Sequence, residues 1–90
     1  MKRVCILISG DVQGVYFRAF VKDRAQELDL TGYVRNTEDK KVEAIIEGHE
    51  LKINKLIDQC KEGPVGAKTI NVTTTTQHYT GEFKEFRVKY

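Results

Sequence analysis

The 90-residue sequence predicts an α+β fold: a sandwich of order βαββαβ, with two helices on one face of an antiparallel sheet and one further strand at the C-terminus. Three observations predict it. Short apolar segments rich in β-branched side chains indicate strands, two longer segments repeat apolar residues at helical spacing, and each helical segment lies between strands. A chain of this length has room for one core, so we expect residues 1–90 to form a single domain.

The first strand and the first helix flank a loop that contains glycine. Residues 4–8 form a continuous apolar run, which predicts a central strand covered on both faces. From residue 17 onward, apolar side chains recur on one helical face: Phe17, Phe20, Val21, Ala25 and Leu28. We expect Asp29 to end this helix in the left-handed conformation, which aspartate tolerates.

The next segment is a hairpin whose direction matters for function. Residues 32–36 and 42–47 are typical of paired strands, joined by a turn at 37–41. The first helix returns the chain to the start of the sheet, so the second strand ends at the same edge as the first. We therefore expect the loop at 10–18 and Asn36 to be neighbours in space.

A second helix and two strands complete the order. Helical spacing returns from residue 50 and stops at Gly63-Pro64. The apolar face of this helix holds Ile53, Leu56, Ile57 and Cys60. Residues 67–77, which include a threonine run, and residues 86–90 are predicted to be strands. This arrangement is the ferredoxin-like, or split βαβ, sandwich.

The loop at residues 10–18 has the sequence Gly-Asp-Val-Gln-Gly-Val-Tyr-Phe-Arg, which is typical of a site that binds an anion. Gly10 and Gly14 permit close approach to the backbone, and amides at a helix N-terminus attract negative charge. Arg18 adds a planar cation with donors suited to phosphate or carboxylate. The same pattern also fits an ordinary turn followed by a solvated arginine, and composition alone leaves both interpretations open.

Composition excludes several classes of protein. Lys plus Arg is 15 against 13 for Asp plus Glu, and the cations are scattered, which argues against a nucleic-acid-binding face. Strand 42–47 also lacks the aromatic residues with which RNA-recognition modules stack bases. The apolar run at 4–8 is too short for a signal peptide or a membrane span, so we expect a cytoplasmic protein without a membrane partner. Cys5 and Cys60 are then free thiols.

Two long motifs resemble those of a known family. Residues 10–18 resemble the signature loop of the acylphosphatases. Residues 32–39, Gly-Tyr-Val-Arg-Asn-Thr-Glu-Asp, are similar to the second signature of that family, and the similarity continues to the C-terminus in the same order and spacing.

This resemblance implies an enzyme that hydrolyses an acyl phosphate to a carboxylate and inorganic phosphate, without a metal or cofactor. Arg18 would bind the phosphoryl group and Asn36 would orient the attacking water. The cradle for the phosphate would consist of backbone N–H groups up to Arg18, from Gln13, Gly14, Val15, Tyr16 and Phe17. We expect the enzyme to act as a monomer.

Two positions depart from the family pattern. Asp11 stands where the family commonly has a basic or polar residue, and a carboxylate pointing inward would weaken phosphate binding. Asp11 therefore motivates an alternative: an acylphosphatase-like module that binds a phosphorylated ligand or partner but catalyses weakly. Lys40 stands where a glycine is usual, so we expect a different turn type or a longer loop, because lysine disfavours positive φ.

The remaining candidates have structural interpretations. We expect Cys5 to be buried within its strand. The sequence leaves Tyr33 two interpretations, one beside the site and a simpler one in the core as an aromatic residue of a strand. Arg35 should face the side of the sheet opposite to Asn36. His49 and His78 have no partner at metal-ligand spacing, so we interpret both as surface or capping residues.

Overall fold

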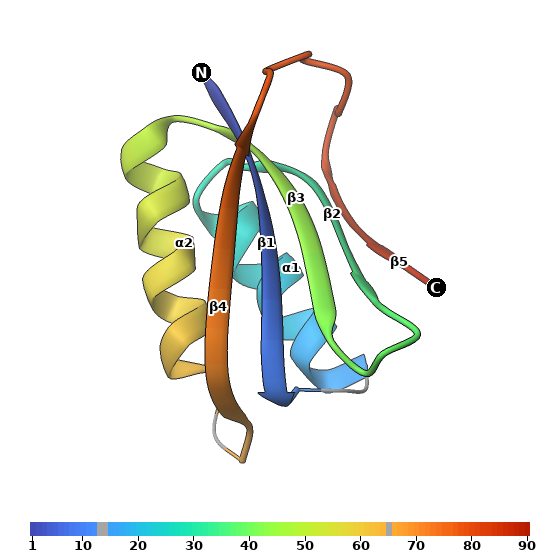
Figure 1. The fold of residues 1–90 in the computed structure, drawn as a ribbon. Coiled ribbons are helices and arrows are strands. Elements are labelled where there is room, and N and C mark those ends of the chain that lie inside the picture. The colour runs from blue at the N-terminus through green and yellow to red at the C-terminus, as the bar shows by residue number, and fades with distance from the viewer. Residues whose placement is uncertain (13–14, 65) are drawn as a thin grey trace.

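The computed structural model describes residues 1–12, 15–64 and 66–90 and confirms the predicted order of elements. In chain order they are β1 (Lys2–Asp11), α1 (Val15–Glu27), β2 (Thr31–Asn36), β3 (Val42–Gly48), α2 (Glu50–Glu62), β4 (Lys68–Gln77) and β5 (Phe86–Lys89). Both helices cover the same face of the sheet, as predicted (Figure 1). No helix in these described ranges is long and apolar enough to cross a membrane.

The sheet has the strand order β4-β1-β3-β2-β5. Neighbours among β1, β2, β3 and β4 pair antiparallel, whereas the C-terminal strand β5 pairs parallel with β2 and makes the sheet mixed. β4 and β5 therefore form opposite edges, and the connection between them passes one end of the sheet (Figure 1). This placement brings the C-terminus beside β2.

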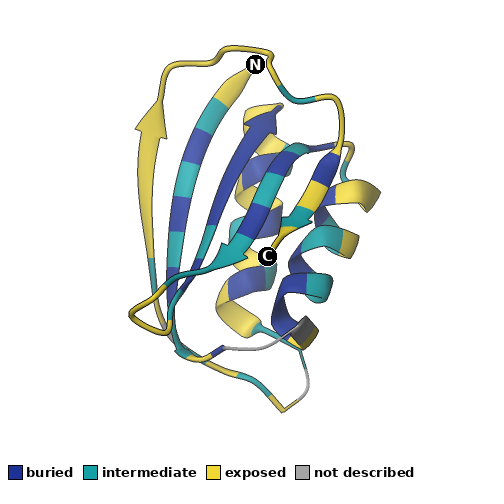
Figure 2. Ribbon diagram, turned by 90° about the vertical axis from the view of Figure 1, so that its right-hand side faces the viewer, coloured by how far each residue is buried: buried dark blue, intermediate teal, exposed yellow. Residues whose placement is uncertain are grey.

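The core lies between the sheet and the two helices, and it corrects one expectation about β1. Val4, Ile6 and Ile8 are buried on the helix side, while Cys5 and Leu7 are only half-buried on the other side. The alternation of buried and intermediate residues is visible along the strands in Figure 2. Coverage of β1 on both faces was therefore a wrong prediction, as was burial of Cys5, because both helices pack on one face.

Among the residues that the structure describes, two that are not glycine adopt positive φ, and they test the predictions about turns. Asp29 ends the first helical segment at φ 57°, which confirms its left-handed conformation. Lys40 takes φ 64° in the β2–β3 hairpin, so the expectation that lysine would avoid positive φ at this position was wrong. The Thr37 N–H donates to the Lys41 carbonyl at 2.9 Å, and the Lys41 N–H donates to the Thr37 hydroxyl at 3.0 Å. These bonds close the turn tightly enough to hold Lys40 in a disfavoured conformation.

Candidate active site

The sheet register brings the predicted site residues to one edge. Val42 of β3 pairs with Ile8 of β1 on one side and with Asn36 of β2 on the other. These three residues form a row across the sheet near the point where β1 leads into α1. In Figure 1 the end of β1, the start of α1 and the end of β2 all lie at the lower edge. The expected proximity of Asn36 to the start of the first helix follows from this register.

Arg18 lies in the second turn of α1 and is largely buried, with 7% of its surface exposed. Its Nη1–H group donates to the Lys89 carbonyl at 3.3 Å. The guanidinium carbon also lies 4.7 Å from the centroid of the Tyr90 ring, within the range of a cation–π interaction. The C-terminal end of β5 therefore holds the cation in place.

Asn36 is the last residue of β2 and faces the helix side of the sheet. Val34, two residues earlier, is fully buried in the core, and side chains two apart in a strand share a face. Arg35 points to the other face, as predicted, and there its Nε–H donates to Glu43 at 2.9 Å. Because Arg35 pairs with Lys89 in the parallel register, Asn36 lies beside the same end of β5 that contacts Arg18.

Both residues carry a buried polar atom that lacks a hydrogen-bond partner. Within the described part of the chain, three buried side-chain atoms are in this state: Arg18 Nε, Asn36 Oδ1 and Gln59 Oε1. Buried polar atoms are normally paired, so each exception calls for an explanation. One donor and one acceptor left open at the same edge are what a bound oxyanion and a water molecule would satisfy.

The other predicted site residues surround the start of α1. Gln13 and Gly14 lie outside the described residues. Val15 begins the helix, the Tyr16 side chain is mostly exposed, and Phe17 is buried in the core. The first turn carries no acidic side chain, so nothing within it offsets the partial positive charge of the helix N-terminus.

One departure from the family pattern, Asp11, and two residues that sequence reasoning missed lie near the site. Asp11 is exposed at the end of β1, opposite Lys68 in the β4 register. Lys89 and Tyr90 were predicted only as part of a strand, and their contacts with Arg18 were not foreseen. The alternation at 86–90 places Tyr90 on the same face as buried Phe86, and that signal identifies Tyr90 once β5 is known to pair with β2.

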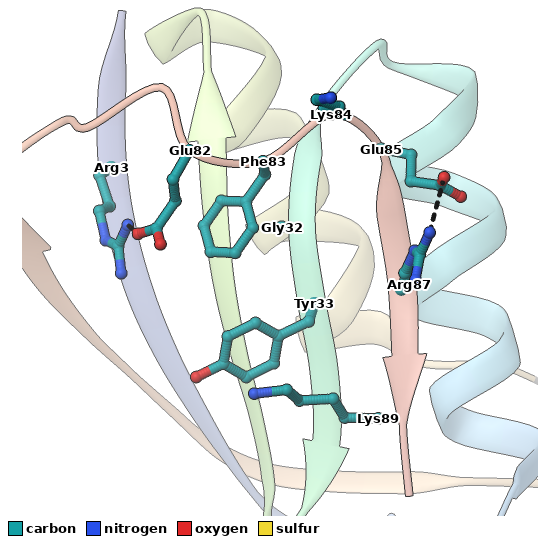
Figure 3. Close-up of a pocket in the computed structure, with 9 residues that line it drawn as sticks. All are labelled: Arg3, Gly32, Tyr33, Glu82, Phe83, Lys84, Glu85, Arg87 and Lys89. Carbon is teal, nitrogen blue, oxygen red and sulfur yellow. Dashed lines mark hydrogen bonds and ion pairs between the residues drawn. The ribbon is translucent and has the colours of Figure 1, made fainter.

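A cavity of about 530 Å³ lies on the face of the sheet opposite to the helices, and Lys89 is among the residues that line it (Figure 3). Tyr33 lines it and lies edge-on to Phe83 with ring centroids 5.9 Å apart, so the prediction that Tyr33 belongs to the core was wrong. Three of the cationic side chains that line the cavity, Arg3, Arg87 and Lys89, already contact other side chains. Arg3 contacts Glu82 at 2.5 Å, and Lys89 Nζ lies 4.1 Å from the centroid of the Tyr33 ring.

The remaining candidates are consistent with structural roles. No group of three or more metal-binding side chains occurs among residues 1–12, 15–64 and 66–90. His49 precedes α2 as its N-cap residue without a side-chain capping bond, and His78 is exposed. Cys60 is buried in the core, and this burial raises the pKa of its thiol to about 12, so it is protonated at neutral pH.

Comparison with known proteins agrees with this geometry. The family model described as Acylphosphatase matches residues 4–88. The chain is 42% identical over 90 residues to an acylphosphatase of Syntrophus aciditrophicus, covering 100% of this chain and 94% of that protein. It is 42% identical over 88 residues to an acylphosphatase of Pelotomaculum thermopropionicum, covering 98% and 96%. The crystal structure of acylphosphatase from Bacillus subtilis superimposes with a TM-score of 0.95 at 31% identity, covering 100% of both chains. The chain belongs to the acylphosphatase family.

Proposed function

We propose that the protein hydrolyses acyl phosphates to a carboxylate and inorganic phosphate, with Arg18 and Asn36 acting on the same phosphoryl group. The observation that carries the proposal is the pair of buried, unpartnered atoms Arg18 Nε and Asn36 Oδ1, which belong to residues at one edge of the sheet. Arg18 Nε–H can donate to a phosphoryl oxygen, and Asn36 Oδ1 can accept from the attacking water, which are the two partners that the hydrolysis requires.

In this proposal the phosphate binds at the start of α1. Backbone N–H groups from Gln13 through Phe17 form the cradle, and the helix N-terminus contributes partial positive charge. Arg18 supplies the fixed cation. Because the Lys89 carbonyl and the Tyr90 ring already hold its guanidinium, little reorganisation is required when substrate binds.

Asn36 would hold the attacking water through its side-chain oxygen. The water oxygen forms a bond to phosphorus while the bond from phosphorus to the acyl oxygen breaks. The leaving carboxylate has a conjugate acid of pKa about 4, so it departs as an anion at neutral pH and needs no strong general acid. An amide is a poor base, so a phosphoryl oxygen of the substrate takes the proton of the water.

The wider properties follow the same proposal. We infer that residues 1–90 act as one unit and that the protein works as a cytoplasmic monomer. A small-molecule acyl phosphate is its substrate, and it needs neither a nucleic acid nor a membrane. The scattered charge of the sequence supports this view.

Phosphate release from acetyl phosphate in the presence of EDTA tests the proposal. The wild type should turn over steadily, and Asn36→Ala and Arg18→Ala should each lose about 100-fold or more in kcat/KM, as when one group that stabilises the transition state is removed. Asn54→Ala and Arg87→Ala are matched controls at exposed positions. Binding of phosphate without turnover by the wild type would favour the weakly catalytic module instead. Full activity of Asn36→Ala would refute the proposed role of Asn36.

A further inference from the structure

A groove of about 560 Å³ runs along α1 on the side next to the end of α2. It is lined by Tyr16, Ala19, Phe20, Asp23, Arg24, Gly63 and Pro64, and we refer to it as the α1–α2 groove. The five α1 positions 16, 19, 20, 23 and 24 follow helical spacing and form one stripe. The stripe begins in the first turn, beside the amides proposed to hold phosphate. The groove is therefore an extension of the site along the helix.

The α1–α2 groove and Arg18 lie on different flanks of the same helix. Tyr16 and Arg18 are two residues apart, which in an α-helix is a rotation of about 200°. Arg18 faces the end of β5, because its partners are Lys89 and Tyr90. Tyr16 faces the residues that follow α2, because it lines the groove with Gly63 and Pro64. The start of α1 thus separates a polar flank from a largely apolar one.

The geometry of phosphoryl transfer gives these flanks different roles. The attacking and leaving oxygens lie roughly in line on opposite sides of phosphorus. Water held by Asn36 approaches from the flank formed by β2 and β5. The acyl oxygen must then depart toward the other flank, where the α1–α2 groove opens beside Tyr16.

We propose that the α1–α2 groove binds the acyl group of the substrate and that it selects acyl phosphates with a flat apolar acyl group, such as an aryl group. This inference rests on the proposed function, because it takes the positions of phosphate and water from it. Tyr16, Ala19 and Pro64 provide apolar walls at the end near the phosphate. The volume is within the range of ligand pockets and exceeds what an acetyl group can fill.

The far end of the groove sets a limit on the ligand. The Arg24 guanidinium lies 5.4 Å from the centroid of the Phe20 ring and contacts Glu27 at 2.8 Å. The Asp23 carboxylate adds a negative charge there, with Lys22 at 3.9 Å. A long acyl chain would therefore meet charged groups, whereas an aryl group would remain against Tyr16 and Ala19.

The ratio of kcat/KM for benzoyl phosphate to that for acetyl phosphate tests the inference. The ratio cancels effects on phosphate and water, which both substrates share. The wild type should favour benzoyl phosphate by about tenfold or more, the selectivity that an apolar pocket provides. Ala19→Leu fills the groove with a larger side chain and should lower the ratio by about tenfold. Asn54→Leu, which adds the same side chain at an exposed α2 position, should leave the ratio within about twofold.

Tyr16→Ala provides a second test that does not depend on Ala19→Leu being stable. It removes an exposed apolar wall and should also lower the ratio severalfold. An unchanged ratio in both folded variants, with both substrates hydrolysed, would overturn the assignment of the groove and leave the proposed function intact. Failure of the wild type to hydrolyse either substrate would instead overturn the proposed function, and this inference with it.

Discussion

Replacing Arg18 by lysine keeps the positive charge and removes the planar fork, which separates two contributions of this side chain. In the structure one guanidinium nitrogen, Nη1, donates to the Lys89 carbonyl, while Nε is buried without a partner. An arginine can therefore hold the backbone and phosphate at the same time. A lysine side chain has a single nitrogen as hydrogen-bond donor, so one ammonium group would have to serve both the Lys89 carbonyl and the phosphate.

The magnitude follows from the loss of one charge-assisted hydrogen bond, which is about 1.5–3 kcal/mol in a buried setting. With about 1.36 kcal/mol for each factor of ten, Arg18→Lys should lower kcat/KM by about 13-fold to 160-fold. Arg18→Ala should lose more, because the charge also disappears. The measurement is initial-rate phosphate release over a range of acetyl phosphate concentrations, with folding verified by circular dichroism.

Arg87→Lys is the matched control, since Arg87 is exposed on β5 and contacts Glu85 at 3.2 Å. It should retain activity within about twofold, the scale expected for a surface ion pair. If Arg18→Lys also retained activity within twofold, the proposed use of separate guanidinium nitrogens would be wrong.

Three further predictions concern the scaffold. Glu47 is buried and accepts hydrogen bonds from the Thr80 and Gly81 N–H groups, so Glu47→Ala should lower the free energy of unfolding, measured by urea titration, by about 3 kcal/mol. Glu43 is half-buried on the same face, and Glu43→Ala should lower the free energy of unfolding much less. Equal losses in the two variants would contradict this prediction. Lys40→Gly should raise the free energy of unfolding by up to about 1 kcal/mol, because φ is positive at position 40 and glycine adopts positive φ without strain. The control Lys41→Gly should lower the free energy of unfolding. Destabilisation by both variants would show that Lys40 is not strained. Burial raises the pKa of the Cys60 thiol from 9.0 to about 12, so the contribution of the protonated thiol to stability is complete below about pH 9 and is lost as pH rises toward 12. The difference in the free energy of unfolding between wild type and Cys60→Val should therefore change between about pH 9 and 12. A difference that stays constant over this range would argue against the raised pKa.

The topology made the positions of the candidate site residues in the fold predictable from the sequence. The βαββαβ order requires β1 and β2 to end at the same edge, so the placement of Asn36 at the same edge of the sheet as the end of β1 could be predicted from the sequence. Arg18 was recognised from its place in the motif at 10–18. Its burial against β5 could not be foreseen, because alternation at 86–90 indicates a strand but not its neighbour.

The wrong predictions for Tyr33, Cys5 and Lys40 also have physical causes that a local sequence pattern does not reveal. The path of the chain from β4 to β5 depends on Glu47, whose carboxylate accepts from backbone amides 33 and 34 residues later in the sequence. That path covers part of the outer face and brings Phe83 to Tyr33. Tyr33 lies on this outer face because its neighbour Val34 faces the helices, and side chains alternate along a strand. Cys5 was misplaced because a short apolar run does not reveal how many faces are covered. At Lys40, closure of the hairpin outweighed the backbone preference of lysine.

The central claim is that one phosphoryl group lies between Arg18 and Asn36. A crystal structure of the protein with its product, inorganic phosphate, measures this directly. We expect phosphate oxygens within hydrogen-bond distance of the Arg18 guanidinium and of the amides at the start of α1, with a water molecule between the phosphate and Asn36 Oδ1. Phosphate bound at the outer cavity beside Lys89 and Tyr33, with Arg18 Nε still unpartnered, would contradict the claim.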